Sequence, residues 1–483
     1  MMALSSLLAQ IAGDDLGYTN QTSVHPVGFA VLAVLGVLVF TLPRRWSLAP
    51  LLVLACFVPA GQRIAFLGLD FTFLRLLVIA YWMRILAFRD YRGLRLVALD
   101  YAVGAWILIV SVVFILQWSS TSAIINRAGY IYESLGIYIT FRCLLRSWAD
   151  VERTIVILAL VSLGCAGFFM IEKQTGYNMF SVMGGVRTYT QVREGRLRAQ
   201  GAFSHPIMAG CFFAIVLVLA SGLYMNRRKR TTAMAGCIAS ATIVIMCASS
   251  TPLLAVLSGG IAMAFAWVRE LLRPFRYALV ALLVMLHFVM EGPVWALIAR
   301  VSAVGGSTAW HRKHLIDKTV ENFGEWALLG TRTTEHWGYG LQDVTNQYIL
   351  EGVRGGIWGM VAFVVVIVLA FRAVGKALKT EPTRRGLFWL KWAVGASLFT
   401  HCMAFIGVSY FGQTRVAWFL TLALAATISQ LPAMKSRPPK GSGSLTTNDK
   451  RLPRGRPRHQ LQHERDDPRL LTHDPRGRKQ DQP

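Results

Sequence analysis

The sequence predicts an all-α protein, a polytopic bundle of about 12–13 transmembrane helices, and three observations support this. Hydrophobic residues make up 54% of the 483 residues and charged residues only 16%, with a mean hydropathy of +0.47. Soluble domains need more polar surface than this to stay dispersed. Apolar runs of roughly 17–22 residues recur and match the hydrocarbon thickness of a bilayer. The alternating short strands of a transmembrane barrel are absent from the sequence.

The expected spans are separated by short loops, except at two polar segments, 173–204 and 299–354. We expect spans at 27–42, 48–61, 70–87, 101–117, 130–146, 154–172, 205–224, 232–250, 252–268, 277–297, 355–371, 388–407 and 415–431. Residues 1–431 therefore form one membrane domain. Residues 432–483 are rich in Pro, Gly, Gln, Arg and Asp and almost lack apolar side chains, which predicts a disordered tail.

The orientation of the chain follows from its basic residues, because cytoplasmic loops carry an excess of Lys and Arg. Alternate loops hold clusters such as Arg44–Arg45 and residues 227–230. This pattern places the tail in the cytoplasm, and both polar segments and the amino terminus on the outer face. The same loops account for much of the net charge of +25, so no nucleic-acid partner is expected.

Several chemistries are unsupported by the sequence. It contains no GxxxxGK[ST], D-x-D, HExxH or GxSxG motif, so no site for a soluble nucleotide substrate is evident. The seven cysteines form no CxxC pair and are interpreted as packing residues. Enzymes that act on the outer face without ATP commonly use lipid-linked, pre-activated donors.

The first polar segment ends in a basic stretch that leads directly into an apolar helix. Arg193, Arg196 and Arg198 precede Ser204-His205-Pro206, and we expect Ser204 to cap that helix. Three guanidinium groups and the free N–H groups of a helix start predict a binding site for a diphosphate. The alternative is that these arginines only contact lipid headgroups.

The second polar segment is balanced in charge, with six Lys/Arg and six Asp/Glu. Its histidines, His311, His314 and His336, invite a metal hypothesis, but their spacing matches no familiar ligand set, so no metal is expected. Glycine and aromatic residues gather in 336–340, which favours a carbohydrate-facing loop. A merely solvated face remains the alternative.

Together these outer residues resemble the O-antigen ligase and O-antigen polymerase superfamily of bacterial inner-membrane proteins. The matching residues, in order, are Arg198-x-x-Gly201, His205-Pro206, Arg312, a Leu-Leu-Gly and a Gly-Tyr-Gly loop, Thr345-Asn346 and Gly356-x-x-Gly359. The family pattern is His-[Asn/Ser/Gln], nine residues, then Gly-x-x-Gly. Asn346, Gly356 and Gly359 fit this pattern, but Thr345 occupies the histidine position. The match covers residues 195–372, whereas over residues 1–170 it rests on hydropathy.

The resemblance implies a metal-independent, cofactor-free glycosyltransferase. Such enzymes move a glycan from undecaprenyl diphosphate to an acceptor hydroxyl on the periplasmic side. Arg198 and Arg312 match the family's arginines, which bind the diphosphate. The lipid-linked glycan and the bilayer are the implied partners, together with a flippase and a chain-length regulator.

The threonine at position 345 leaves the catalytic base open, because threonine does not accept a proton near neutral pH. His336 is the first replacement, and Glu335, Asp343 and Glu351 are others. The departure favours a polymerase-type or exopolysaccharide-assembly relative over a ligase, and an inactive relative is a further alternative.

A different class of function is a transporter of a lipid-linked glycan. Such a protein depends on ionisable residues within its spans, here Asp70 and Glu133. Separately from this choice of function, Gly356 and Gly359 either shape the active loop or serve close helix packing at a span entrance.

Overall fold

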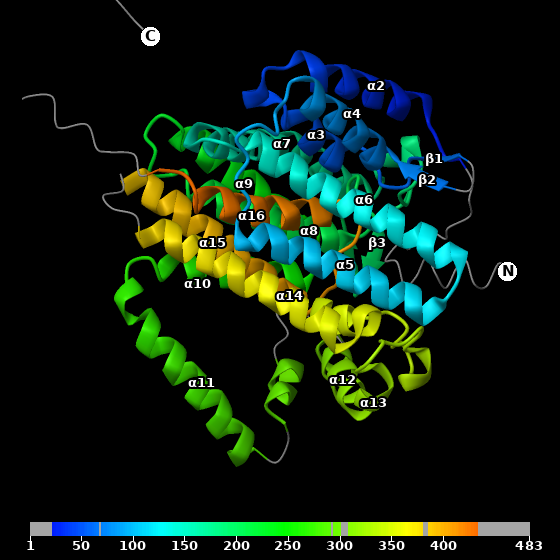
Figure 1. The fold of residues 1–483 in the computed structure, drawn as a ribbon, viewed down its shortest axis with the longest axis vertical. Helices are drawn as coiled ribbons and strands as arrows, with labels where there is room; N and C mark the ends of the chain where they lie inside the picture. The colour runs from blue at the N-terminus through cyan, green and yellow to red at the C-terminus, as the bar shows by residue number, and fades with distance from the viewer. Residues whose placement is uncertain (1–21, 67–68, 291–292, 301–307, 380–384, 433–483) are drawn as a thin grey trace, which may run out of the picture. The chain divides into compact units, whose positions relative to one another are not determined.

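The computed structural model describes residues 22–66, 69–290, 293–300, 308–379 and 385–432 (Figure 1). The amino terminus, which was predicted to face outward, and nearly all of the predicted tail therefore lie outside the described residues. The chain divides into one compact unit, Met1–Ser436, and a second unit, Arg437–Pro483. The second unit lies wholly outside the described residues, so the fold below concerns the first.

The protein is mostly helical, at 72%, which confirms the coarse prediction. The α-helices of the described residues are α2 (Pro26–Thr41), α3 (Ala49–Phe57), α4 (Phe73–Ala87), α5 (Ala98–Trp118), α6 (Thr121–Leu144), α7 (Trp148–Thr175), α8 (Pro206–Ser221), α9 (Arg230–Met246), α10 (Ser250–Ala264), α11 (Leu272–Val289), α12 (Thr308–Glu321), α13 (Phe323–Trp326), α14 (Gln347–Lys379), α15 (Arg385–Phe405) and α16 (Thr414–Ile428). Short 3₁₀ turns lie at Arg44–Trp46, Met179–Met183, Arg269–Leu271, Val294–Arg300 and Glu335–Trp337.

Three helices of the described chain, α5, α7 and α14, are long and apolar enough to cross a membrane. A further set of apolar helices is shorter, at 10–17 residues each. It comprises Pro26–Thr41, Pro206–Ser221, Arg230–Met246, Ser250–Ala264, Pro274–Val289 and Thr414–Ile428. The structure therefore has the apolar helices expected of a membrane protein.

Two short antiparallel hairpins depart from the all-α prediction. Strand β1 (Arg63–Phe66) pairs with β2 (Leu69–Thr72), and β3 (Gln191–Arg193) pairs with β4 (Arg196–Arg198). The second hairpin turns through Glu194 and Gly195, both with positive φ, which is the geometry of tight two-residue hairpin loops. Hydropathy does not detect such short polar strands.

The core of the bundle surrounds α16, in which nearly every side chain is buried. Helix α14 packs along α5, helix α9 packs against α7 and α8, and α10 packs against α8 and α15. The core is apolar, with Phe212, Phe213 and Phe419 among its largest fully buried side chains. These contacts bring helix ends from distant parts of the chain together.

The helix starts of α4, α6, α8, α14 and α16 gather at one end of the bundle. The hairpins β1–β2 and β3–β4 and the helices α12 and α13 lie at this same end, on the right of Figure 1. We call it the hairpin end. The loops with the basic clusters Arg44–Arg45 and 227–230 lie at the other end, the basic-loop end.

Helices α12 and α13 and the following loop share a small apolar core with the start of α14. Leu315, Trp326, Trp337 and Leu341 are buried in it. The predicted polar segment 299–354 is thus folded where the structure describes it, while residues 301–307 lie outside the described set.

Helix α14 is interrupted at Gly356, where φ is +60° and ψ is −167°. A Cβ at this position would lie 2.4 Å from the carbonyl oxygen of Leu328, so only glycine fits. The Ile357 N–H donates to the carbonyl of Ala327 at 2.8 Å. The kink therefore seats the 327–330 loop on α14 and separates its first turns from the long apolar part.

Candidate functional site

The hairpin β3–β4 buries Arg198 at the hairpin end. Arg198 pairs in register with Gln191, and its Nη1 donates to Gln191 Oε1 at 3.4 Å. Only 3% of the residue is exposed, and its Nε has no hydrogen-bond partner among the described residues. Burial first, and then the charge of Arg193, lower the pKa of Arg198.

A buried carboxylate fixes the segment that follows Arg198. Glu172 accepts hydrogen bonds from the backbone N–H groups of Gln200 at 3.0 Å and Gly201 at 2.8 Å, and from the Thr190 hydroxyl at 3.3 Å. Gly201 has a φ of +60°, and a Cβ there would lie 2.4 Å from the ring of Phe169. Glu172 is a positioning residue that no sequence motif indicated.

His205 caps α8 in place of the predicted Ser204. Its Nδ1 accepts a hydrogen bond from the Ile207 N–H at 3.1 Å. Burial lowers the pKa of His205 to about 4, and the charges of Arg198, Arg187 and Arg193 act in the same direction. The ring is therefore neutral near pH 7, with its proton on Nε2. Such a ring donates a hydrogen bond and is not a base.

Arg312 reaches the same end from α12. It is 8% exposed, and its Nη2 donates to the Thr251 hydroxyl at 2.7 Å. A Cβ on Gly407 would lie 3.0 Å from Arg312 Nε, so the 407–411 loop packs closely on the guanidinium. Burial first lowers the pKa of Arg312, and Arg193 adds to this effect.

Arg193 connects these groups electrostatically. Its charge acts on Arg198, on His205 and on Arg312, although these residues come from β4, the start of α8 and α12. The fold therefore places Arg193 within electrostatic range of all three residues. Arg196 is exposed on the hairpin and has no part in these contacts.

Neither Arg198 nor Arg312 has a carboxylate within the 4.0 Å of an ion pair in the part of the chain that the structure describes. Some buried arginines elsewhere do have one: Arg63 lies 3.2 Å from Asp70, and Arg142 lies 2.7 Å from Asp100. A buried cation without a counter-charge is costly. Arg193 itself lies 3.9 Å from Glu194, whereas the charges of Arg198 and Arg312 suit an external anion.

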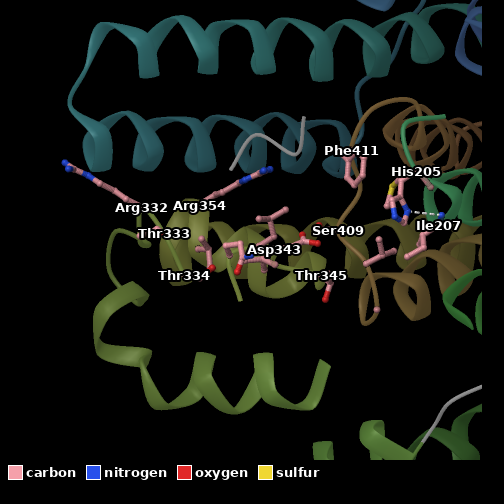
Figure 2. Close-up of a pocket in the computed structure, with 17 residues that line it drawn as sticks. His205, Ile207, Arg332, Thr333, Thr334, Asp343, Thr345, Arg354, Ser409 and Phe411 are labelled. Carbon is pink, nitrogen blue, oxygen red and sulfur yellow. Dashed lines mark hydrogen bonds between the residues drawn. The ribbon is translucent and has the colours of Figure 1, made fainter. Parts of the chain in front are cut away.

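A cavity of about 130 Å³ adjoins this cluster (Figure 2). His205 lines one side of it, with Gly407 beside Arg312. Asp343 and Thr345 line its middle. The cavity therefore places a neutral imidazole and a carboxylate around one space.

Asn346 shapes the cavity wall instead of facing the cavity. Its Oδ1 accepts from the N–H groups of Tyr348 at 3.0 Å and Ile349 at 3.2 Å, and its Nδ2 donates to the Ile406 carbonyl at 3.2 Å. This caps α14 and joins it to the loop before Gly407. The neighbouring Thr345 hydroxyl lines the cavity, with no hydrogen-bond partner within the described chain.

Gly356 and Gly359 lie outside the residues that line this cavity. A Cβ on Gly359 would lie 2.8 Å from the Glu351 carbonyl oxygen and 3.0 Å from Val110. Both glycines therefore allow close packing at the kink of α14, which is the structural alternative that the sequence left open.

His336 also lies outside the cavity lining. Its Nε2 is 2.9 Å from Glu325 Oε2, which accepts from Trp337 Nε1 at 2.9 Å as well. Burial opposes ionisation of Glu325, but hydrogen bonds from Thr331, His336 and Trp337 lower its pKa. The predicted catalytic role of His336 is not supported by this placement.

The other two histidines lie on α12. His311 donates to the backbone carbonyl of Asp343, and burial, followed by the charges of His314 and Arg312, lowers its pKa. His314 stacks on Trp310 with ring centroids 4.8 Å apart. Among the residues described, no three His, Cys, Asp or Glu side chains are grouped to hold a metal ion.

Sequence reasoning missed Thr251, Glu172 and the 407–411 loop, which all contact or position the cluster. Their residue types carry no distinctive signal, and they reach the site only through helix packing. Comparison with known proteins adds no assignment, since no family model and no curated protein matches the chain.

Proposed function

We propose that this protein is a polysaccharide polymerase-like, metal-independent glycosyltransferase of the bacterial inner membrane. It transfers a glycan from undecaprenyl diphosphate to an acceptor hydroxyl on the periplasmic face, in exopolysaccharide or O-antigen assembly. The sequence resemblance over residues 195–372 suggests this reaction, and the cation cluster at the hairpin end supports it. The hairpin end is the periplasmic one in this proposal.

One observation carries the proposal: Arg198 and Arg312 are buried without a carboxylate at ion-pair distance in the described chain. Neither lines the cavity of about 130 Å³, but Arg312 packs against Gly407, which does. A diphosphate leaving group gains negative charge as the glycosidic bond breaks. Fixed guanidinium groups stabilise that charge without reorganisation. His205 Nε2–H adds a neutral donor to the same group.

The membrane arrangement of the proposal is the predicted bundle of about 12–13 spans. The shorter apolar helices then cross the bilayer together with α5, α7 and α14. The separation of the basic loops from the hairpin end supports this arrangement, because cytoplasmic loops carry most Lys and Arg. A lipid-linked donor then reaches Arg198 from the outer leaflet.

Asp343 is the base in this mechanism. It takes the proton of the acceptor hydroxyl while the acceptor oxygen bonds to the anomeric carbon. The bond from that carbon to the diphosphate oxygen breaks, and its electron pair leaves with the diphosphate. Asp343 lines the cavity whereas His336 does not, so Asp343 is the better placed of the residues considered for the missing histidine.

The test is the size distribution of lipid-linked and surface glycan in a deletion strain complemented with variants. Wild type restores polymer, whereas Arg312→Ala and Asp343→Asn leave single repeat units on the carrier. His336→Ala restores polymer. Polymer restored by Arg312→Ala would overturn the enzyme proposal, and full-length polymer stranded on undecaprenyl diphosphate would identify a ligase.

A transporter is the second candidate, and one observation favours it. Glu133 in α6 holds an ion pair with Arg75 at 2.9 Å and with Arg415 at 2.8 Å inside the bundle. A transporter requires Glu133 and tolerates loss of Arg312. The same complementation assay with Glu133→Gln, scored for export and for polymer length, separates the two functions.

A further inference from the structure

An exposed aromatic surface lies outside the cavity, on α12 and the loop that follows α13. Trp310 is 62% exposed and Tyr339 is 100% exposed. One face of the Trp310 indole is covered by the His314 imidazole, with ring centroids 4.8 Å apart and an interplanar angle of 15°. The opposite face of the indole is therefore open to solvent. We call Trp310, His314 and Tyr339 the aromatic platform.

Two glycines hold the Tyr339 loop against the histidines of α12. Gly338 and Gly340 both have positive φ, of +153° and +77°. A Cβ on Gly338 would lie 3.1 Å from His314 Nε2, and one on Gly340 would lie 3.7 Å from His311 Cε1. The loop backbone therefore lies against both imidazole rings. Because the Tyr339 side chain between these glycines is fully exposed, its ring is free to contact a ligand.

The charges beside the platform place it in water. Lys313 lies 2.5 Å from Asp317, and Lys318 lies 2.5 Å from Glu321, all on the same helix as Trp310. Charged groups at this density are costly in the hydrocarbon region of a bilayer. The platform therefore lies outside that region, so acyl chains do not cover its rings.

Two other tryptophans near this loop differ from Trp310. Trp337 is 4% exposed and belongs to the apolar core with Leu341. Trp358 is 57% exposed, but it follows the kink at Gly356 and begins the long apolar part of α14. In the proposed membrane arrangement, lipid covers such a side chain. Among these three, Trp310 is therefore the one that is exposed beside charged groups.

The platform continues to the cavity of about 130 Å³. His311, one turn before His314 on α12, donates a hydrogen bond to the backbone carbonyl of Asp343. Asp343 lines the middle of the cavity in Figure 2. The platform is therefore next to the part of the wall that carries the proposed base.

Exposed aromatic rings in such a place favour a carbohydrate ligand. The C–H groups on one face of a pyranose ring are weakly positive, and they pack on the negative π face of Trp or Tyr. The hydroxyl groups at the edge of the sugar remain in water. Two exposed rings around His314 suit a ligand that repeats its stacking faces, as a glycan chain does.

We propose that the aromatic platform binds the glycan chain of the substrate outside the cavity, by stacking on its sugar rings. Its place beside Asp343 assigns it the sugars beyond the one that reacts, and this assignment rests on the proposed function. A chain that stays on the platform after one transfer is available for the next. The platform therefore sets polymer length, whereas Arg198 and Arg312 act on the diphosphate.

The first test is binding of the surface polysaccharide of the wild-type strain, released from its lipid, to the full chain in lipid nanodiscs. Wild type is expected to bind it. Trp310→Ala and Tyr339→Leu each weaken binding about tenfold, because each removes a stacking face. Tyr339→Phe keeps the ring and binds as wild type does. The matched control is Trp267→Ala, which removes a 73% exposed tryptophan that follows α10 and leaves binding unchanged.

The outcomes separate the platform from the proposed function. Absence of binding to wild type, or equal binding by wild type, Trp310→Ala and Tyr339→Leu, overturns the platform. The proposed function is decided separately, by polymer length in Arg312→Ala. In the same complementation assay, Trp310→Ala is expected to give shorter polymer without accumulation of single repeat units. Polymer of wild-type length in Trp310→Ala overturns the role of the platform in chain length.

Brominated lipids test the alternative cover of the platform, which is the headgroup region of the bilayer. The difference in fluorescence between wild type and Trp310→Phe is the emission of Trp310. A change of this emission on adding polysaccharide, without quenching by brominated lipids, supports the proposal. Quenching by the lipids would place the indole in the bilayer and overturn it.

Discussion

The two ends of the bundle bury arginines in different surroundings. At the basic-loop end, Arg142 lies 2.7 Å from Asp100 and Arg84 lies 3.4 Å from Asp90. At the hairpin end, Arg127, Arg198 and Arg312 have no carboxylate at ion-pair distance within the described residues. Both ends desolvate guanidinium groups, but at the hairpin end these three charges have no carboxylate in contact.

The difference is not a property of the hairpin end as a whole, because Arg63 there is paired with Asp70 at 3.2 Å. It concerns individual buried arginines, of which Arg312 packs against Gly407 at the cavity of about 130 Å³. A paired arginine contributes to stability, whereas an uncompensated one reduces it until an anion binds. The paired arginines therefore belong to the fold, whereas the proposed function assigns Arg198 and Arg312 among the uncompensated ones to anion binding.

The largest expected effect is opposite changes of stability when the two kinds of arginine are replaced. Arg142→Met leaves Asp100 buried and unpaired, which costs about 3–5 kcal/mol. Arg127→Met removes a buried charge that has no carboxylate in contact, so the free energy of unfolding rises. Thermal unfolding of both variants without ligand measures the difference, and a loss of stability in Arg127→Met would contradict the comparison.

The next effect concerns catalysis. Arg198→Gln is expected to lower the turnover of lipid-linked donor on the order of 10²–10³-fold, because a charge-stabilising donor is lost. Arg44→Gln breaks the 3.4 Å contact to Asp150 at the basic-loop end and costs at most about 1 kcal/mol of stability, with turnover unchanged. Equal turnover losses in the two variants would refute a special role for the hairpin end.

A smaller effect is a dependence of stability on pH. The pKa of His205 is about 4 in the folded chain and about 6.5 in the unfolded chain. The unfolded state therefore binds the extra proton as the pH falls below 6.5, and stability decreases by about 2 kcal/mol between pH 7 and pH 5. His205→Asn keeps a capping side chain, and the stability of this variant should no longer show the decrease that is due to His205 between pH 7 and pH 5. An unchanged slope of unfolding temperature against pH would show that His205 is not the group responsible.

The smallest effect tests whether local capping orders the cavity wall. Asn346→Ala removes the cap of α14 and is expected to lower stability by about 1 kcal/mol. Asn346→Asp retains an oxygen acceptor for the Tyr348 and Ile349 N–H groups and should restore most of it. Unfolding temperatures of the three proteins provide the measurement.

Apolar run length predicted the mostly helical fold, but it did not predict the local features near the site. The apolar runs at 101–117 and 154–172 correspond to α5 and α7. The hairpin that carries Arg198 was not predicted, because three-residue strands are too short to leave a hydropathy signal. Ser204 was expected as the cap of α8, but the ring of His205 makes that hydrogen bond, a choice set by burial next to Arg198.

The sequence alone predicted a mostly helical protein with apolar helices, and it indicated the candidate cations. Composition and apolar run length reflect the solvent that surrounds the chain, and Arg193, Arg198 and Arg312 stand out because they lie on the predicted outer face. Only the tertiary structure decided which arginines have a carboxylate close enough to compensate their charge. Ion pairs here join residues far apart in the chain, such as Arg415 and Glu133. Packing likewise decided that Asp343, and not His336, lines the cavity, since the wall consists of segments that meet only in the folded bundle.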